Sequence, residues 1–281
     1  MEPILTATAY IHTRLGRTAY MASGSIGPPL LFVHGNSCCK EAFAKQFDNS
    51  ALRRHRLLAV DLPGHGNSDD VSDCPADATL ANFARWLQEL IQDLGLGRPV
   101  VVGWSLGGHI AIEGLGQGMA LAGLVLCGTP PAGPGAGEME EAFMPSPEMA
   151  MTGKAAFTEA EAIRYCDSLY GGADLQNTGL AKAVRRAQGA VRESLLENYQ
   201  QPGACHSQRA VVADNACPIA VIQGGADAFV NRAYFETLQW RNLWRDRVQF
   251  IETAGHAPFF ERPDAFNATL LEFLGDLGYR A

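Results

Sequence analysis

The sequence pattern best suited to chemistry is a serine flanked by glycines, in the segment Gly103-Trp104-Ser105-Leu106-Gly107. This segment follows the apolar run 99–102 and precedes a stretch of helical character, so we expect Ser105 on a sharp strand-to-helix turn. Glycines beside such a turn remove side chains that would collide with neighbouring backbone. The start of the helix presents partial positive charge to a developing anion. Ser105 is therefore the candidate nucleophile; the alternative is a glycine-rich helix start that only packs against a sheet.

A serine hydroxyl becomes a useful nucleophile only when a base removes its proton. Where a serine occupies a strand-to-helix turn of this kind, an acid and then a histidine follow it along the chain. His256 comes directly after the last apolar run, and the other six histidines lie in less suitable contexts. Asp227 ends the run 218–227, whereas the run 121–130 is followed by no carboxylate before Glu138. We predict His256 as general base and Asp227 as the acid that orients it; the alternatives are a structural histidine and a helix-capping aspartate.

Acyl transfer also needs hydrogen-bond donors for the negatively charged oxygen of the tetrahedral intermediate. The backbone N–H of Leu106, directly after the serine, is one candidate donor. The loop 34–37 follows an earlier apolar run, and the backbone N–H of Asn36 in it is the second candidate. The alternative is that this loop only shapes a turn. The residues that we predict to contact the substrate are His34, Gly35, Trp104, Met144, Tyr165 and Phe229.

The composition argues against several classes of partner. The formal net charge is -8, from 30 acidic and 22 basic residues, so nothing favours nucleic acid or an anionic membrane. There is no HxHxDH cluster and no CxxC pair, so we expect no metal and no cofactor. The seven scattered cysteines are typical of reduced thiols in a cytoplasmic protein. We recognise no secretory signal and no apolar segment of bilayer length, and the oligomeric state stays open.

Apolar runs alternate with helical patterns along most of the chain. Near-continuous apolar runs indicate strands buried on both faces, which predicts an α/β fold with a mostly parallel, eight-stranded sheet flanked by helices. An antiparallel hairpin over 8–21 is expected at one edge. The predicted strands lie within 30–35, 55–64, 99–105, 121–130, 218–227 and 247–256, and the predicted helices within 79–94, 106–117, 231–241 and 261–277.

The interval between the fourth and fifth of these runs breaks the alternation. It opens with a Pro- and Gly-rich segment and continues with helical patterns near 158–170 and 178–200. We therefore predict a core of 1–130 and 217–281 with a helical cap, 131–216, inserted between two core strands. The cap is rich in Met and Phe, which suits an irregular apolar tunnel for a substrate. Packing of the cap onto the core explains the same residues equally well.

With these residues in place, the chain resembles the α/β-hydrolase superfamily over nearly its whole length. Within that superfamily it resembles the metal-independent N-acyl-homoserine lactonases. The motifs that carry the resemblance are HGNS (34–37), DLPGHGNS (61–68), VVGWSLGGHIAIE (101–113), GTPP (128–131), NLW (242–244) and AGHAPF (254–259).

The resemblance implies a quorum-sensing signal as substrate, namely a homoserine lactone ring with a fatty amide tail. Ser105 would attack the ring carbonyl, and Tyr165 aligns with a cap tyrosine that would hydrogen-bond the substrate, although core packing is an alternative. The family pattern also places a glutamate beside the aspartate, where this chain has Ala228. A broad carboxylesterase, a carbon–carbon bond hydrolase and a ligand receptor with little turnover remain as alternatives.

Overall fold

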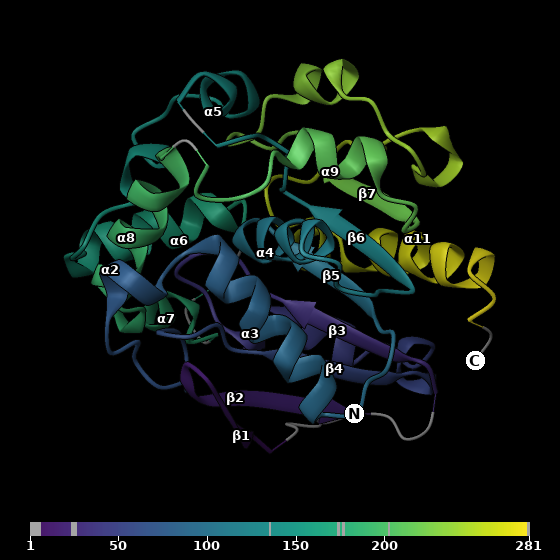
Figure 1. Ribbon diagram of the computed structural model, residues 1–281, viewed down its shortest axis with the longest axis horizontal. Helices are drawn as coiled ribbons and strands as arrows, with labels where there is room; N and C mark the ends of the chain where they lie inside the picture. Colours follow the sequence, from purple (N-terminus) through teal and green to yellow (C-terminus); the bar gives the residue numbers. More distant parts are fainter. Residues whose placement is uncertain are drawn as a thin grey trace.

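The computed structural model describes residues 7–23, 27–134, 136–172, 175, 178–201 and 203–279. Its centre is an eight-stranded sheet in the order β1-β2-β4-β3-β5-β6-β7-β8, which confirms the predicted fold class (Figure 1). Only the pairs β1–β2 and β2–β4 are antiparallel, as the hairpin at the edge predicted. The strands are β1 Ala9–Thr13, β2 Gly16–Ser23, β3 Pro29–Val33, β4 Arg56–Val60, β5 Val100–Trp104, β6 Gly123–Cys127, β7 Ile219–Gly224 and β8 Gln249–Ile251.

Burial explains why the central strands read as continuous apolar runs. Every residue of β5, β6 and β7 is buried, because helices cover both faces of the parallel part of the sheet. In β1, by contrast, exposed and half-buried residues alternate, as expected of an edge strand with one face toward solvent. The strands are shorter than the predicted runs, since the last residues of each run form the loop that follows the strand.

Helices pack on both faces of the sheet. In Figure 1, α3 (Leu80–Asp93) and α4 (Leu106–Gly116) lie in front of it and α11 (Pro263–Asp276) behind it. Thr79 caps the start of α3: its Oγ1 accepts a hydrogen bond from the backbone N–H of Asn82 at 3.1 Å, as is usual at a helix N-terminus. α3 and α9 (Gln208–Asp214) pack against α4. The remaining short elements outside the β6–β7 connection are η1 Lys40–Phe43, α1 Ala44–Phe47, η2 Leu52–Arg54, α2 Cys74–Asp77, η4 Arg232–Thr237, η5 Trp244–Asp246 and α10 Pro258–Glu261.

The connection from β6 to β7 contains helices joined by loops in its described parts before α9. It contains α5 Ala136–Ala142, η3 Met149–Met151, α6 Glu159–Leu169, α7 Leu180–Arg186 and α8 Gly189–Gln200. In Figure 1, α6, α7 and α8 gather on one side, at the left of the view. The division at 131–216 stays a prediction, and α9 lies within that range although it packs on the core helix α4.

One predicted helix, 178–200, is in fact two, because Gln188 interrupts it. The backbone N–H of Gln188 donates to the carbonyl of Gly64 at 2.8 Å. Its side chain accepts from the N–H of Val71 at 2.8 Å and donates to the Val71 carbonyl at 3.0 Å. These contacts hold Gln188 in an extended conformation and tie the helical insertion to the loop after β4.

The predicted helix over 231–241 is wrong. Only the 3₁₀ turn η4, Arg232–Thr237, forms there, and the chain is extended at Leu238. Beyond it, the N–H of Arg241 donates to Val212 at 3.0 Å and the carbonyl of Asn242 accepts from Ile219 at 2.9 Å. Hydrogen bonds to α9 and β7 therefore replace the helical ones.

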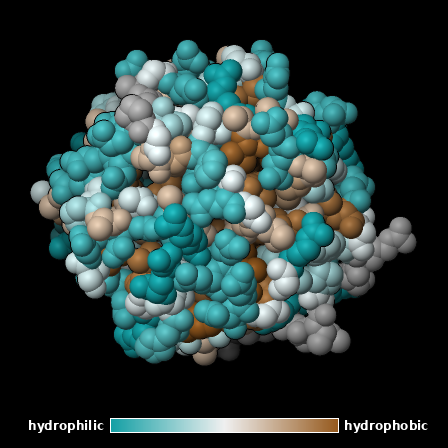
Figure 2. Space-filling view, viewed as in Figure 1, coloured by the Kyte–Doolittle hydropathy of each residue, from teal (hydrophilic) through white to brown (hydrophobic). Residues whose placement is uncertain are grey.

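The surface is mainly polar in the view of Figure 2, with apolar side chains showing toward the centre, over the region of α4. No helix in the described ranges is both long and apolar enough to span a bilayer.

Candidate active site

Ser105 stands at the junction of β5 and α4, in the strained geometry expected of a sharp turn. Its backbone has φ 51° and ψ -118°, a region that costs a non-glycine residue about 1–3 kcal/mol. The surrounding structure holds it there: the Ser105 N–H donates to the carbonyl of Cys127 at 2.8 Å, and the Ser105 carbonyl accepts from Thr129 Oγ1 at 3.0 Å. The strain projects the Ser105 side chain from the end of the sheet instead of burying it.

The glycines around the turn have a steric cause. A Cβ atom on Gly107 would lie 2.2 Å from the carbonyl oxygen of Val33, which belongs to the neighbouring strand β3. A Cβ on Gly103 would lie 2.6 Å from the Cα of Gly108. Both contacts are with backbone, which cannot move aside as a flexible side chain would. Glycine at 103 and 107 is therefore required for α4 to start so close to the sheet.

His256 and Asp227 meet as a hydrogen-bonded pair. His256 Nδ1 lies 2.8 Å from Asp227 Oδ2, and both side chains are at most 3% exposed. Burial by itself would raise the pKa of Asp227, but the His256 ring and hydrogen bonds from the Phe229 N–H and Gln223 Nε2 outweigh it and lower the pKa. A charged carboxylate at this position fixes the proton of His256 on Nδ1, which leaves Nε2 as the proton acceptor. Ala228 is exposed.

The loop that carries His256 is held from several directions. The Glu261 carboxylate accepts hydrogen bonds from the N–H groups of Gly255 and Ala257 at 2.8 and 3.0 Å. It therefore holds the backbone in place on both sides of the histidine. Trp104 Nε1 donates to the His256 carbonyl at 2.9 Å. The ring of Phe229 lies 4.8 Å from the His256 ring, centroid to centroid. The imidazole therefore has little freedom to turn away from Asp227.

Two backbone donors face the same region without acceptors. Among the described residues, the N–H groups of Asn36 and Leu106 donate no hydrogen bond. Gly35 brings the Asn36 loop close, since a Cβ at Gly35 would lie 3.1 Å from Ser105 Cβ. The Asn36 side chain is engaged elsewhere: its Nδ2 donates to the carbonyl of Thr152 at 2.7 Å, which links the loop after β3 to the β6–β7 insertion. The backbone N–H of Asn36 is therefore the donor in this loop that we assign to the oxyanion.

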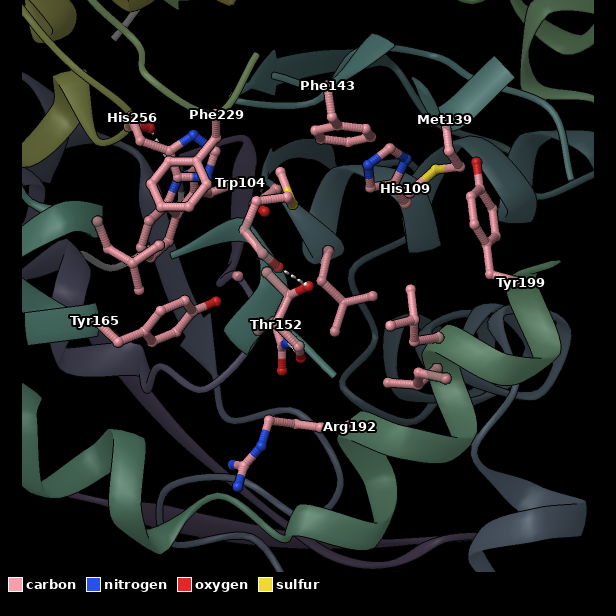
Figure 3. Close-up of a pocket in the computed structure, with 18 of the residues that line it drawn as sticks. Trp104, His109, Met139, Phe143, Thr152, Tyr165, Arg192, Tyr199, Phe229 and His256 are labelled. Atoms are coloured by element: carbon pink, nitrogen blue, oxygen red, sulfur yellow. Dashed lines mark hydrogen bonds between the residues drawn. The ribbon is translucent and has the colours of Figure 1, made fainter. Parts of the chain in front are cut away.

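A cavity of about 850 Å³, counted out to its mouth, joins these groups. Ser105 and His256 line it together, although no hydrogen bond joins Ser105 Oγ to His256 in the part of the chain described here. Such bonds are often loose before substrate binds, and one rotation about the Cα–Cβ bond moves the hydroxyl. Figure 3 shows His256 and Phe229 at one end of the cavity, Met139 and Tyr199 at the other.

Five of the predicted substrate-contact and oxyanion residues line this cavity with Leu106, namely Gly35, Asn36, Trp104, Tyr165 and Phe229. His34 does not. It is fully buried, its Nδ1 lies 2.7 Å from the Gly35 carbonyl, and its Nε2 accepts from the N–H of Leu62 at 3.0 Å. Burial lowers the pKa of His34 to about 4, so its ring is neutral at pH 7 and supports the loop. Met144 does not line the cavity either; it is 45% exposed at the surface.

A family model described as the alpha/beta hydrolase family matches residues 30–269. The chain belongs to this family. A solved structure of the N-acyl homoserine lactonase AidH, as a mutant complexed with N-hexanoyl homoserine lactone, matches with a TM-score of 0.91 at 35% identity, over 96% of this chain and 98% of that one.

Relatives by sequence carry other activities in their names. The 2-hydroxy-6-oxononadienedioate/2-hydroxy-6-oxononatrienedioate hydrolase of Burkholderia vietnamiensis is 27% identical over 286 residues, 92% of this chain and 91% of that protein. The pimeloyl-(acyl-carrier protein) methyl ester esterase of Nitrosomonas europaea is 29% identical over 252 residues, 85% of this chain and 93% of that protein. This alpha/beta hydrolase is therefore an enzyme, and its relatives cleave different bonds.

The cavity of this alpha/beta hydrolase also contains polar residues that the sequence analysis missed, His109, Thr152 and Arg192. The position of His109 could have been predicted, because it lies four residues after Ser105 and so on the same face of the helix. Arg192 had none. Its buried guanidinium donates to the carbonyls of Lys154 and Ala155, both at 2.7 Å, contacts that only the folded insertion creates.

No group of three or more potential metal-ligating side chains occurs within the ranges that the structure describes. The alpha/beta hydrolase site therefore offers, from its described residues, a hydroxyl, an imidazole–carboxylate pair and two backbone donors. These are the parts that acyl transfer through a serine requires.

Proposed function

We propose that this hydrolase opens the ring ester of N-acyl homoserine lactones through an acyl-enzyme on Ser105. The observation that carries the proposal is the cavity itself. Ser105, His256 and the two residues with unpaired backbone N–H groups line it together with many apolar side chains, and Asp227 contacts His256 from behind. The likeness to an N-acyl homoserine lactonase, at 35% identity over 96% of the chain, adds support for a lactone with an apolar tail.

The chemistry proceeds in two steps. His256 Nε2 takes the proton of Ser105 Oγ, which attacks the ring carbonyl, and the N–H groups of Asn36 and Leu106 stabilise the oxyanion. When the intermediate collapses, the ring C–O bond breaks, and the alkoxide oxygen takes the proton from His256. Water, deprotonated by the same nitrogen, then attacks the acyl-enzyme. Serine leaves with the proton, and the product is the open N-acyl homoserine with a free carboxylate.

Asp227 has an electrostatic and an orienting part in this scheme. Its carboxylate faces the imidazolium that forms in both steps, and the 2.8 Å contact with Nδ1 keeps Nε2 toward the serine. Burial strengthens this interaction because little water screens the two groups. The buried backbone donors likewise need no rearrangement when the oxyanion appears.

A second candidate is the carbon–carbon bond hydrolysis named for the Burkholderia vietnamiensis relative. The dioate in that name is a doubly charged substrate, which needs cationic partners. Of the described residues that line the cavity, only Arg192 carries a permanent positive charge. Because its guanidinium already donates to backbone carbonyls, we rank this candidate below an uncharged lactone or ester. A broad carboxylesterase, which would prefer short linear esters, is the third candidate.

The deciding experiment is a hydrolysis screen with identified products. N-acyl homoserine lactones of several tail lengths are compared with p-nitrophenyl esters and with a dienedioate ketone. We expect kcat/KM for the lactones to exceed that for the linear esters of equal chain length, with N-acyl homoserine as the product. Turnover of linear esters alone would contradict the lactonase proposal and favour the carboxylesterase. The Ser105→Ala variant serves as the blank for non-enzymatic ring opening.

A further inference from the structure

His109 is a second histidine that lines the cavity, and it has no role in the proposed reaction. It lies on α4 one turn after Ser105, and its ring packs 6.0 Å from the rings of Phe143 and Tyr199, centroid to centroid. The Tyr199 hydroxyl donates to the carbonyl of Ala132 at 2.8 Å, so it is not a partner for His109. In Figure 3, His109 lies among Phe143, Met139 and Tyr199, away from His256.

The hydrogen bonds of Gln208 fix which nitrogen of His109 carries the proton. Gln208 is fully buried, and its Nε2 donates to the backbone carbonyl of His109 at 3.3 Å. This contact orients the amide so that Oε1 faces His109 Nδ1, at 2.8 Å. An amide oxygen only accepts hydrogen bonds, so Nδ1 must be the protonated nitrogen. In a neutral ring, Nε2 is then a bare acceptor.

The imidazole ring of His109 is neutral at pH 7. Burial, with a smaller contribution from positive charge on His256, lowers the pKa of His109 to about 4. The proton that His256 gains during the reaction therefore does not pass to His109. Among the described residues no group donates to His109 Nε2. A side chain that is nine-tenths buried thus presents a fixed, unpartnered acceptor to the substrate cavity.

We propose that His109 Nε2 accepts a hydrogen bond from an amide N–H on the substrate, next to the scissile carbonyl. The preferred substrates are then esters and lactones with an acylamino group on the carbon beside that carbonyl. The inference rests on the proposed function for the reaction at Ser105 and adds a selectivity that the Ser105, His256 and Asp227 groups do not supply. Neutral His109 suits an N–H donor and does not favour a carboxylate at this point.

Tyr165 supplies the complementary half of the site. Its hydroxyl has no hydrogen-bond partner among the described residues, although the residue is 1% exposed. Figure 3 shows Tyr165 and His109 entering the cavity from different sides. In a trans amide the C=O and N–H bonds point in opposite directions, so a donor on one side and an acceptor on the other fit the two ends of one amide. The apolar lining residues of the cavity that would receive the tail are Leu80, Met139, Phe143, Leu195 and Leu196.

The test uses substrate pairs that differ only in the N–H group. N-hexanoyl homoserine lactone is compared with its ester analogue, in which oxygen replaces the amide nitrogen. The p-nitrophenyl esters of N-hexanoylglycine and O-hexanoylglycolic acid form a second pair without a lactone. We expect the wild-type enzyme to favour the amide member of each pair by about tenfold in kcat/KM, as one hydrogen bond allows.

Variants of His109 show whether this preference depends on its acceptor. His109→Phe keeps a ring but removes the acceptor, and the amide preference should fall to about one. His109→Gln can again present an oxygen and should restore part of the preference. The double variant His109→Phe with Gln208→Leu removes both polar partners from the buried pair, which guards against misfolding caused by an unpaired Gln208. It should show the same loss of preference.

The outcomes separate this inference from the proposed function. An amide preference that survives in His109→Phe and in the double variant would overturn the inference, as would equal turnover of both members by the wild type. If the wild type opens no lactone but keeps an amide preference in the p-nitrophenyl pair, the lactonase proposal fails and the role of His109 stands. If lactones open rapidly without any amide preference, the lactonase proposal stands and the role of His109 fails.

Discussion

Replacing Asp227 by asparagine perturbs one atom of the buried pair and tests the proposed division of roles. Asp227 Oδ2 lies 2.8 Å from His256 Nδ1 and accepts from Gln223 Nε2 at 2.7 Å, while Oδ1 accepts from the N–H of Phe229 at 2.8 Å. Donors therefore surround both carboxylate oxygens. The NH2 group of an asparagine at either oxygen position would therefore face another hydrogen-bond donor, which is unfavourable.

The expected loss of kcat depends on which of two orientations the asparagine amide adopts. If the NH2 group takes the Oδ2 place, His256 must accept at Nδ1 and carry its proton on Nε2, which leaves no base for Ser105. If it takes the Oδ1 place, it opposes the backbone donors of Phe229 and Val230. The NH2 group thus meets two backbone donors at the Oδ1 position, but only one fixed donor, Gln223 Nε2, at the Oδ2 position. We therefore expect the wrong tautomer to dominate and kcat to fall by roughly 10³–10⁴-fold, which is about 4–5.5 kcal/mol of transition-state stabilisation.

The assay is steady-state hydrolysis of p-nitrophenyl acetate, a small ester whose binding does not depend on the tail region. KM should change little, because the carboxylate does not touch the substrate. Glu252→Gln is the matched control: it makes the same carboxylate-to-amide change in the exposed pair with Arg232, and its kcat should stay within about twofold of wild type, as expected of a surface pair. A folded Asp227→Asn enzyme that loses less than tenfold in kcat would refute the reasoning, and another carboxylate would then be the acid.

Other perturbations test neighbouring parts of the account. Tyr165→Phe should raise KM for N-hexanoyl homoserine lactone several-fold and leave p-nitrophenyl acetate turnover almost unchanged, measured on the same preparation. Gly107→Ala should lower the unfolding free energy measured with urea by about 3 kcal/mol or more, because its Cβ would lie 2.2 Å from the Val33 carbonyl oxygen. Gly275→Ala is the control: a Cβ there has nothing within 4 Å, so the unfolding free energy should rise by about 0.5–1 kcal/mol. Burial lowers the pKa of His65 to about 3, so below about pH 6.5 the unfolded chain binds a proton that the folded chain does not. Stability should therefore fall by about 2.3 kcal/mol for this group from pH 6.5 to 4.5, and by less in His65→Asn. Incubation with EDTA should leave the hydrolysis rate unchanged, because the proposed mechanism uses no metal.

The central site was accessible from the sequence because the fold makes its geometry local. Ser105, Asp227 and His256 each follow an apolar run, and the carboxyl ends of parallel strands meet at one edge of a sheet. Strand position was therefore enough to predict that these residues lie together. The same reasoning favoured Asp227 as the acid although Ala228 stands where the family pattern has a glutamate, and Asp227 is the carboxylate that contacts His256.

What the sequence did not reveal depends on contacts between distant segments. Met144 was predicted to contact the substrate, and its neighbour Phe143 was not. Phe143 forms a β-bridge with Val230, and the Met144 N–H donates to the carbonyl of Phe229 at 2.8 Å. Neighbouring side chains in such an extended segment point to opposite sides. Phe143 therefore lines the cavity and Met144 faces solvent. The two misjudged helices have the same origin, since long-range hydrogen bonds replaced the local ones that their periodicity suggested.

Covalent labelling tests the central claim most directly. The enzyme is treated with an activated alkyl phosphonate ester, and intact mass, residual activity and the modified peptide are followed together. The account predicts one phosphonyl group per chain, located on Ser105, with activity lost in the same proportion and with labelling slowed strongly in His256→Ala. Full inactivation with Ser105 unmodified, or full activity with Ser105 modified, would contradict it.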